Sequence, residues 1–266
     1  MASQPMLRTT TPRGIAWQGF GATTRDDAWW VAPAIQGTAF GLFVLYSVFS
    51  AFLWQPLFGV PYEAQGYLSP FFSPVFGQTI LPPLTPAILI LWAPLGLRAT
   101  CYYYRKFYYR AYLFDPPACA VAEPKPHGRY ALERRLPFIL QNLHRFFLYA
   151  AFVPLFFLWI DAIVSLRFEG HWRIGVGTVL LFLNAFLLSG FSLSCHSLRH
   201  LVGGRLDCFS CSYATRARHG VWGFLSRINR HHMAWAWVSL VVVALADLFV
   251  RLLAAGAIHD PLFFRS

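Results

Sequence analysis

Residues 233–256 read MAWAWVSLVVVALADLFVRLLAAG, and this stretch decides the class of fold. Its only charged residues are Asp247 and Arg251. About 20 apolar residues in a helix are long enough to cross the hydrocarbon core of a bilayer, so the stretch predicts a transmembrane helix. The two charges stand four residues apart on one helix face. We interpret them as a structural ion pair, with a proton path to the outer surface as the alternative.

Other apolar runs of similar length precede this one. They lie at about 34–55, 79–97, 137–163 and 174–202. We therefore expect an all-α, polytopic membrane protein in which residues 31–266 form one bundle of five transmembrane helices after a polar tail, residues 1–30. Four prolines in the run at 79–97 are expected to kink its helix or delay its start.

The composition agrees with a membrane protein. Hydrophobic residues make up 57% of the chain and charged residues only 12%, whereas about 25% of a soluble domain is charged. The formal net charge is +11. On a membrane protein an excess of Lys and Arg reports topology and attraction to anionic lipid, so we expect membrane lipid and no nucleic acid as a partner.

The basic residues are distributed unevenly between the connections. The segment 56–79 contains no Lys or Arg, whereas 98–135 and 199–230 are strongly basic. Positive charge marks the cytoplasmic side of short loops. With five spans, this pattern places the protein in the cell (inner) membrane with a cytoplasmic N-terminus and an external C-terminus.

Histidines gather where these spans meet the inner face. His144 lies near the start of the third run, His196 and His200 lie at the end of the fourth, and His232 stands at the start of the fifth. Residues four apart share a helix face, so His196 and His200 can point into one space. Ionisable groups at membrane depth usually serve a function. We expect at least two of these four histidines to bind a redox centre.

Three of the five cysteines fall in the same layer, namely Cys101, Cys119 and Cys195. Cys208 and Cys211 form a CxxC just beyond it, which we interpret as a pair of free thiols because the odd number and irregular spacing of the cysteines do not indicate a disulfide framework. Two thiolates and two imidazoles are the ligands of a Rieske-type [2Fe–2S] cluster. The usual local Rieske spacing is absent, so such a site has to be assembled from different helices.

Other classes of function stay open at this point. One bis-His haem b near the inner face is the main alternative centre, while the absence of His in the outer half of the spans disfavours two haems. A membrane di-iron hydroxylase or desaturase would use His196 and His200 with the pair His231–His232, although such enzymes need more histidine boxes. A transporter is disfavoured because the sequence shows no inverted repeat.

Several strings resemble one known family. They are PPLTPAILILWAPLGLRATCYYYR (82–105), PPACAVAEP (116–124), LPFILQNLHRFFLY (136–149), CHSLRHLVGGRLDCFS (195–210) and HHMAWAWVSLVVVALADL (231–248). Their order and spacing over about residues 60–264 resemble the five-helix membrane anchor of actinobacterial-type succinate dehydrogenase, respiratory complex II.

The resemblance implies a set of partners and a cofactor. In such a complex a flavoprotein oxidises succinate, an iron–sulfur subunit relays electrons, and the anchor docks both and reduces a membrane quinone, menaquinone or ubiquinone. The anchor of this branch looks like one in which a Rieske-type [2Fe–2S] cluster replaces the haem. The metal ligands carried over are Cys101 and Cys119, with two of His144, His196, His200 and His232.

A quinone needs hydrogen-bond donors for its carbonyl groups and an apolar or aromatic slot for its ring. Tyr104, Arg105, Arg199 and Trp235 lie near the inner helix ends and are the candidate quinone-binding residues. No residue is expected to act on succinate, since the chain contains no nucleotide-binding motif such as GxGxxG.

Overall fold

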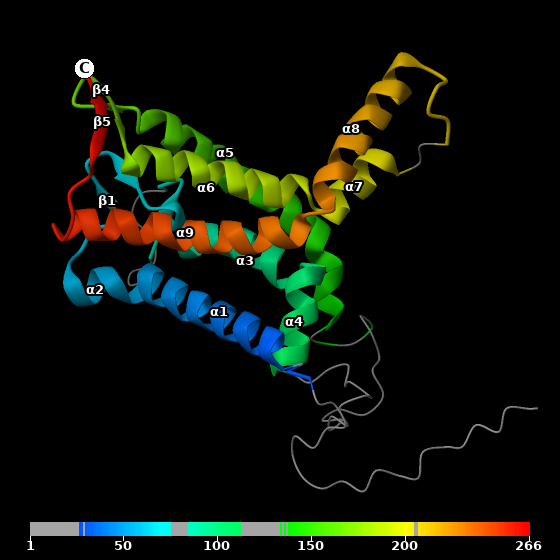
Figure 1. Ribbon diagram of the computed structural model, residues 1–266, viewed down its shortest axis with the longest axis horizontal. Coiled ribbons are helices and arrows are strands. Elements are labelled where there is room, and N and C mark those ends of the chain that lie inside the picture. The colour runs from blue at the N-terminus through cyan, green and yellow to red at the C-terminus, as the bar shows by residue number, and fades with distance from the viewer. Residues whose placement is uncertain are drawn as a thin grey trace, which may run out of the picture.

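The computed structural model describes residues 27–28, 30–75, 85–112, 134, 136, 138–204 and 207–266. Long helices lie side by side and form most of this part of the chain (Figure 1). The helices are α1 (Val31–Val48), α2 (Trp54–Phe58), α3 (Ile88–Ala99), α4 (Tyr102–Tyr112), α5 (His144–Val164), α6 (Val176–Leu193), α7 (His196–Gly203), α8 (Tyr213–Asn229) and α9 (His232–Ala254). A π-helical segment, Phe49–Leu53, joins α1 to α2, and a 3-10 helix, Phe138–Leu143, leads into α5.

Two small antiparallel sheets, which the sequence did not predict, lie together at one end of the bundle (Figure 1). We call this end, which contains the five strands, the sheet end. The strands are β1 (Glu63–Ala64), β2 (Tyr67–Leu68), β3 (Arg167–Phe168), β4 (His171–Gly175) and β5 (Leu262–Arg265), and a short 3-10 helix, Pro70–Phe72, follows β2. Both hairpins turn at two residues of positive φ, Gln65–Gly66 and Glu169–Gly170, as tight hairpin turns require.

The transmembrane prediction is confirmed in its main part. Four helical segments are long and apolar enough to cross a bilayer: Val31–Phe58, Ile139–Val164, Val176–Leu193 and His232–Ala254. The run predicted at 79–97 appears as α3, an apolar helix of only 12 residues that contains Pro94. Residues 79–84 lie outside the described part of the chain, so a fifth full span is not confirmed.

The run predicted at 174–202 is not one helix, and its boundary was wrong. Helix α6 ends at Leu193, and Cys195 adopts an extended backbone with φ −62° and ψ 135° before α7 begins at His196. An extended residue cannot continue the helical hydrogen bonds, so the chain changes direction there. Helices α7 and α8 leave the bundle as a projecting arm (Figure 1). We call these two helices the arm.

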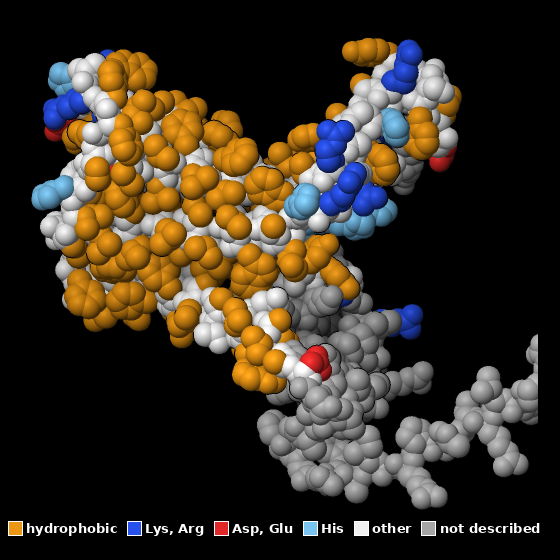
Figure 2. Space-filling view, viewed as in Figure 1, with side chains coloured by type: hydrophobic (Ala, Val, Ile, Leu, Met, Phe, Trp, Pro, Cys, Tyr) orange, Lys and Arg blue, Asp and Glu red, His pale blue; other side chains and the backbone are white. Residues whose placement is uncertain are grey.

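Small residues allow the helices of the bundle to approach one another closely. A Cβ atom on Gly190 of α6 would lie 2.3 Å from the ring of Trp235 in α9, and one on Gly96 of α3 would lie 2.2 Å from the ring of Phe147 in α5. Such contacts are typical of helix packing in membranes. Large apolar side chains such as Leu45 and Phe146 point outward. Figure 2 shows hydrophobic side chains covering the bundle, with basic side chains and histidine on the arm.

The charged pair of α9 lies near the sheet end and is completely buried. The Nε atom of Arg251 lies 3.8 Å from an Asp247 carboxylate oxygen. The same carboxylate accepts hydrogen bonds from the hydroxyl groups of Tyr46 (2.5 Å), Ser50 (2.5 Å) and Ser69. Arg251 in turn donates to the backbone carbonyl groups of Ser50 and Val60. The predicted ion pair is therefore confirmed, and its contacts connect α9 to α1 and to the segment after β2.

Candidate metal and quinone site at the histidine end

Four helix boundaries meet at the end of the bundle opposite the sheets. Cys101 connects α3 to α4, His144 begins α5, Cys195 follows α6, and His232 begins α9. We call this end of the bundle, where these four residues lie, the histidine end. Each of the four stands at or next to the beginning or end of a helix.

Each thiol of the histidine end faces an imidazole. The Sγ atom of Cys101 lies 3.5 Å from Nε2 of His232, and Nε2 of His144 lies 3.1 Å from Sγ of Cys195. Cys101, Cys195 and His232 are buried and His144 is half-buried. The four groups therefore form two Cys–His pairs, each made by segments far apart in the sequence.

Hydroxyl groups fix the orientation of both rings. Nδ1 of His144 lies 2.8 Å from the Thr100 hydroxyl, which itself donates to the carbonyl group of Gly96. Because that hydroxyl proton is committed to the carbonyl, the hydroxyl oxygen accepts from Nδ1–H of His144. The neutral ring then presents the lone pair of Nε2 to Cys195, which is the form that binds metals.

The second ring is held in the same way. Nδ1 of His232 lies 2.7 Å from the Ser194 hydroxyl, which donates to the carbonyl group of Phe191. The Phe191 ring also stacks on the imidazole, with the centroids 5.1 Å apart and the planes 20° apart. The Nε2 lone pair of His232 is therefore directed at Cys101. Both imidazoles are held as metal ligands are held, through the nitrogen that does not bind.

The arrangement distinguishes between types of metal site. Among the described residues, no three His, Cys, Asp or Glu side chains converge on a point that could hold one metal ion. Burial raises the pKa of the Cys101 thiol to about 11, so the free thiol stays protonated and unreactive at neutral pH unless a metal displaces its proton. Two buried thiols and two imidazoles are the donor types of a Rieske-type cluster, which takes both Cys on one iron and both His on the other, so the two mixed Cys–His pairs would have to separate to hold one. A bis-His haem fits less well, because each Nε2 faces a thiol.

The other predicted metal ligands do not take part in the two Cys–His pairs, although His196 lies beside them. Cys119 lies outside the described residues, and Cys195, which the sequence analysis placed in the same layer but did not select as a ligand, faces His144 instead. His196 and His200 do share a helix face, with their rings 5.1 Å apart, but both are exposed on α7. The position of Cys195 directly after the fourth apolar run was the signal that could have identified it.

A hollow of about 280 Å³ adjoins the two Cys–His pairs. Its lining combines both imidazoles with polar and aromatic side chains. The lining residues are Thr100, Cys101, Tyr102, Tyr103, Arg105, Gln141, Asn142, His144, His196, Ser197 and His232. A ligand in this hollow would therefore contact the edges of the histidine rings.

One of the four predicted quinone-binding residues, Arg105, lines this hollow. Tyr104 is the preceding residue and is buried. Its hydroxyl donates to the carbonyl group of Ala236 at 2.5 Å and accepts from Arg98. Trp235 packs on Phe186, with the ring centroids 5.9 Å apart. The guanidinium group of Arg199 lies 5.3 Å from the centre of the Trp222 ring on the arm.

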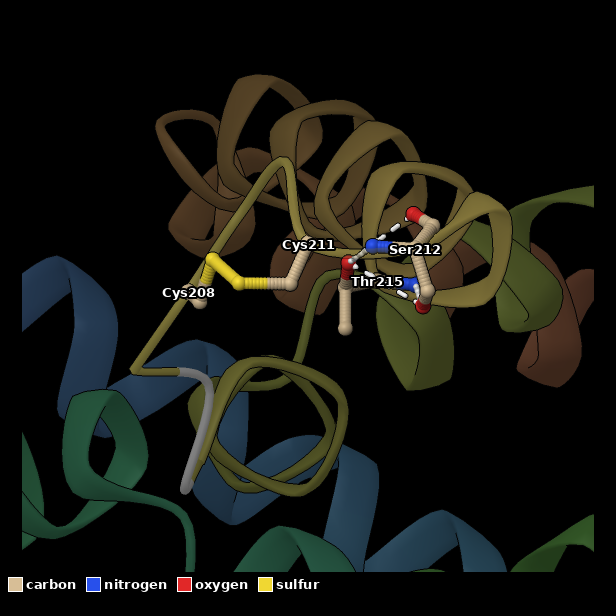
Figure 3. The surroundings of a disulfide bond; sticks show 4 residues. All are labelled: Cys208, Cys211, Ser212 and Thr215. Carbon is tan, nitrogen blue, oxygen red and sulfur yellow. Dashed lines mark hydrogen bonds between the residues drawn. A yellow bond between two sulfur atoms is a disulfide. The ribbon is translucent and has the colours of Figure 1, made fainter.

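The interpretation of the CxxC as free thiols was wrong. Cys208 and Cys211 form a disulfide in the connection between α7 and α8 (Figure 3). Their Cα atoms are 5.7 Å apart, a usual separation for a disulfide. This connection bends and ends at Ser212, whose side chain caps α8 by accepting a hydrogen bond from the backbone N–H of Thr215. This cap fixes the chain at the end of the bend, and the bend brings the two sulfur atoms together.

Comparisons with known proteins agree with this architecture. The family profile described as "Actinobacterial succinate dehydrogenase subunit SdhC" matches residues 31–256. A chain of the solved "Mycobacterium smegmatis Sdh1 complex in the apo form" is 38% identical, with a TM-score of 0.81 over 94% of this chain and 97% of that chain. None of the curated protein sequences matches. With its apolar helix bundle and the family match over most of its length, the chain belongs to the SdhC family of actinobacterial succinate dehydrogenase membrane subunits.

Proposed function

We propose that this chain is the quinone-reducing membrane anchor of a succinate dehydrogenase and that Cys101, Cys195, His144 and His232 hold a Rieske-type [2Fe–2S] centre. The observation that carries the proposal is that two imidazoles present Nε2 lone pairs to two buried thiols. The ligand set differs from the one predicted from the resemblance, because Cys195 replaces Cys119 and the histidine pair is now chosen.

Such a centre supplies one-electron transfer when it is bound. The protein residues around it prepare the ligands. Thr100 and Ser194 hold the Nδ1 atoms, so each ring is fixed through the nitrogen that would not bind metal. Burial of Cys101 and Cys195 keeps water away from the thiolates that would form.

The hollow beside the imidazoles is the proposed quinone site. Arg105 in its wall is a hydrogen-bond donor for a quinone carbonyl, and the Tyr103 ring, 5.3 Å from the His232 ring, offers an aromatic surface. Because His144 and His232 line the hollow, electrons would pass from the ligand side chains to the quinone with no protein layer between them. The support for this route is the short separation between the proposed quinone site and the two imidazoles that line it.

The arm is the proposed docking surface for the iron–sulfur subunit, which in turn carries the flavoprotein. Arg216, Arg227 and Arg230 on or next to α8 are exposed, and Figure 2 shows basic side chains along the arm. A positively charged surface selects a partner with an acidic face and speeds their association. The flavin and iron–sulfur subunits should therefore co-purify with this chain in mild detergent, and a chain that purifies quantitatively alone would contradict the anchor assignment.

The histidine end is proposed to face the cytoplasm, where those partners dock. The support is the basic content of 98–135 and 199–230 compared with 56–79, which contains no Lys or Arg. A topology reporter fused after Gly66 should report an external position, and one fused after Val121 a cytoplasmic one. The reverse pattern would place the site on the wrong side for the docking proposed.

The test of the metal centre compares complexes that differ in one ligand. The intact complex and its Cys101→Ser variant are purified with their partner subunits and analysed for iron, acid-labile sulfide, haem absorbance and the electron paramagnetic resonance spectrum of the reduced state. The variant should lose the iron and sulfide of one [2Fe–2S] cluster together with a Rieske-like signal. An unchanged signal would exclude Cys101 as a ligand. A low-spin haem spectrum would replace the cluster with the single-haem form of the same anchor, and iron without sulfide would favour the hydroxylase.

A further inference from the structure

Next to the histidine end lies a buried cation that has no anionic partner among the described residues. Arg98, near the end of α3, is only 5% exposed. Its guanidinium group donates to the Tyr104 hydroxyl, the carbonyl group of Ala236 and the Ser239 hydroxyl. All three acceptors are neutral. In the described part of the chain the ion pair found is Asp247–Arg251 at the sheet end, and none involves Arg98.

Arg98 is close to ligands from two of the helix boundaries. Its guanidinium group lies 4.7 Å from the centre of the Phe191 ring, and the same ring stacks on the imidazole of His232. The backbone carbonyl of Arg98 also accepts from the N–H of Cys101 at 3.1 Å. The Phe191 ring therefore separates the guanidinium group from His232. In the sequence, Arg98 precedes Cys101 by three residues.

The charge of the proposed centre gives this cation a role. Two ferric ions, two sulfides and two thiolates with neutral imidazoles sum to zero charge, so accepting one electron leaves a net negative charge. The apolar surroundings of Phe191, Leu97 and Leu148 disfavour such a charge, because a low dielectric does not solvate it. A fixed positive charge in the same low-dielectric region stabilises the reduced form and leaves the neutral oxidised form almost unaffected.

We propose that Arg98 sets the reduction potential of the centre at the histidine end by stabilising its reduced state. This inference rests on the proposed function, because it needs the Cys₂His₂ cluster. The electron comes from the iron–sulfur subunit and leaves to the quinone, and no bond to Arg98 forms or breaks. Its three neutral hydrogen bonds hold the guanidinium in place, and its charge acts on the centre through space.

The test is a potentiometric titration of the intact complex followed by electron paramagnetic resonance. Arg98→Gln keeps a hydrogen-bonding side chain and removes the charge, so its midpoint potential should fall by at least about 59 mV, which corresponds to a tenfold loss in electron affinity for a one-electron couple. Arg98→Lys keeps the charge and should remain close to the wild-type midpoint. Iron and sulfide content should be equal in all three proteins.

A second variant covers the case in which Arg98→Gln does not assemble. Ser239→Asp leaves Arg98 in place and sets a carboxylate against the nitrogen that now donates to the Ser239 hydroxyl at 2.9 Å. Neutralising the cation in this way should also lower the midpoint potential. An unchanged midpoint in Arg98→Gln or in Ser239→Asp overturns the inference, as does an equal fall in Arg98→Gln and Arg98→Lys. A wild-type complex without the cluster overturns the proposed centre and this inference together.

Discussion

The two ends of the bundle bury polar groups in opposite ways. Near the sheet end, Asp247 and Arg251 balance each other in charge, and three hydroxyl groups and two backbone carbonyls share their hydrogen bonds. At the histidine end, Arg98 has three neutral acceptors, and two imidazole lone pairs face two thiols that are weak hydrogen-bond partners. The first set is balanced in charge within the protein, although Nε of Arg251 lies 3.8 Å from the carboxylate and has no hydrogen-bond partner among the described residues. The second would become balanced in charge if the proposed centre bound.

This difference separates structural from functional burial. Polar groups in a membrane are costly, so a network that satisfies itself needs no further explanation than stability. At the histidine end the lone pairs face only weak donors and Arg98 has only neutral acceptors, and the proposed centre would complete that set. Variants of the Asp247–Arg251 pair can therefore serve as controls for variants at the histidine end, and the two groups should affect different properties.

The largest effect is expected for Cys195→Ser. A serine hydroxyl is a poor substitute for a thiolate, so the variant should lose essentially all of the [2Fe–2S] signal and of the iron and sulfide that belong to it. Cys208→Ser, in the disulfide of the arm, is the matched control and should keep the full signal. Equal iron and sulfide in both variants would remove Cys195 from the ligand set. The measurement is metal analysis with electron paramagnetic resonance on the purified complex.

A smaller effect, on a different property, is expected for Asp247→Asn. Removing one partner of a fully buried ion pair typically costs about 3–5 kcal/mol, because the other charge is left unpaired. The thermal unfolding midpoint of the complex in detergent should fall, while the spectrum of the centre stays unchanged. The double variant Asp247→Asn with Arg251→Met should recover part of the loss. A change in the spectrum without a loss of stability would mean that the two ends are not independent.

The smallest effect is expected for Thr100→Val, which removes the hydroxyl that orients His144. Loss of such an outer partner usually weakens metal binding by about 10–100-fold, so the variant should release its iron faster than the wild type when exposed to a chelator. The control is Thr178→Val near the sheet end, where the hydroxyl lies 3.2 Å from that of Tyr67. Identical release rates in Thr100→Val and Thr178→Val would show that the hydroxyl does not position the ring.

The sequence predicted the long helices well and the ends of the helices poorly. Length and hydropathy are sufficient to identify a span such as His232–Ala254, because a bilayer imposes a minimum length on it. The break at Cys195 is marked by no proline or glycine, and only the polar residues His196, Arg199 and His200 after it show that the apolar run has ended. The short strands were missed because segments of two to five residues lack a measurable periodicity.

The candidate site was only partly predictable for a related reason. Topology placed Cys101, His144 and His232 at one depth, and the structure brings them together. Choosing between His144 and His196, which begin different helices, depends on which way each helix end faces, and depth alone does not show that. Thr100 and Ser194, whose hydroxyl groups orient the imidazoles, are common residue types and belong to no recognisable sequence motif.

The scattered origin of the four ligands has a consequence for biogenesis. Cys101 and His232, which face each other, are 131 residues apart, and His232 belongs to the last helix of the bundle. A ribosome-bound chain has therefore made most of its length before this pair exists. Under the proposed ligand set, cluster loading would follow insertion of α9 into the membrane, and a chain arrested or misinserted earlier could not be loaded. Possession of the metal centre would then mark the chains whose membrane insertion is complete.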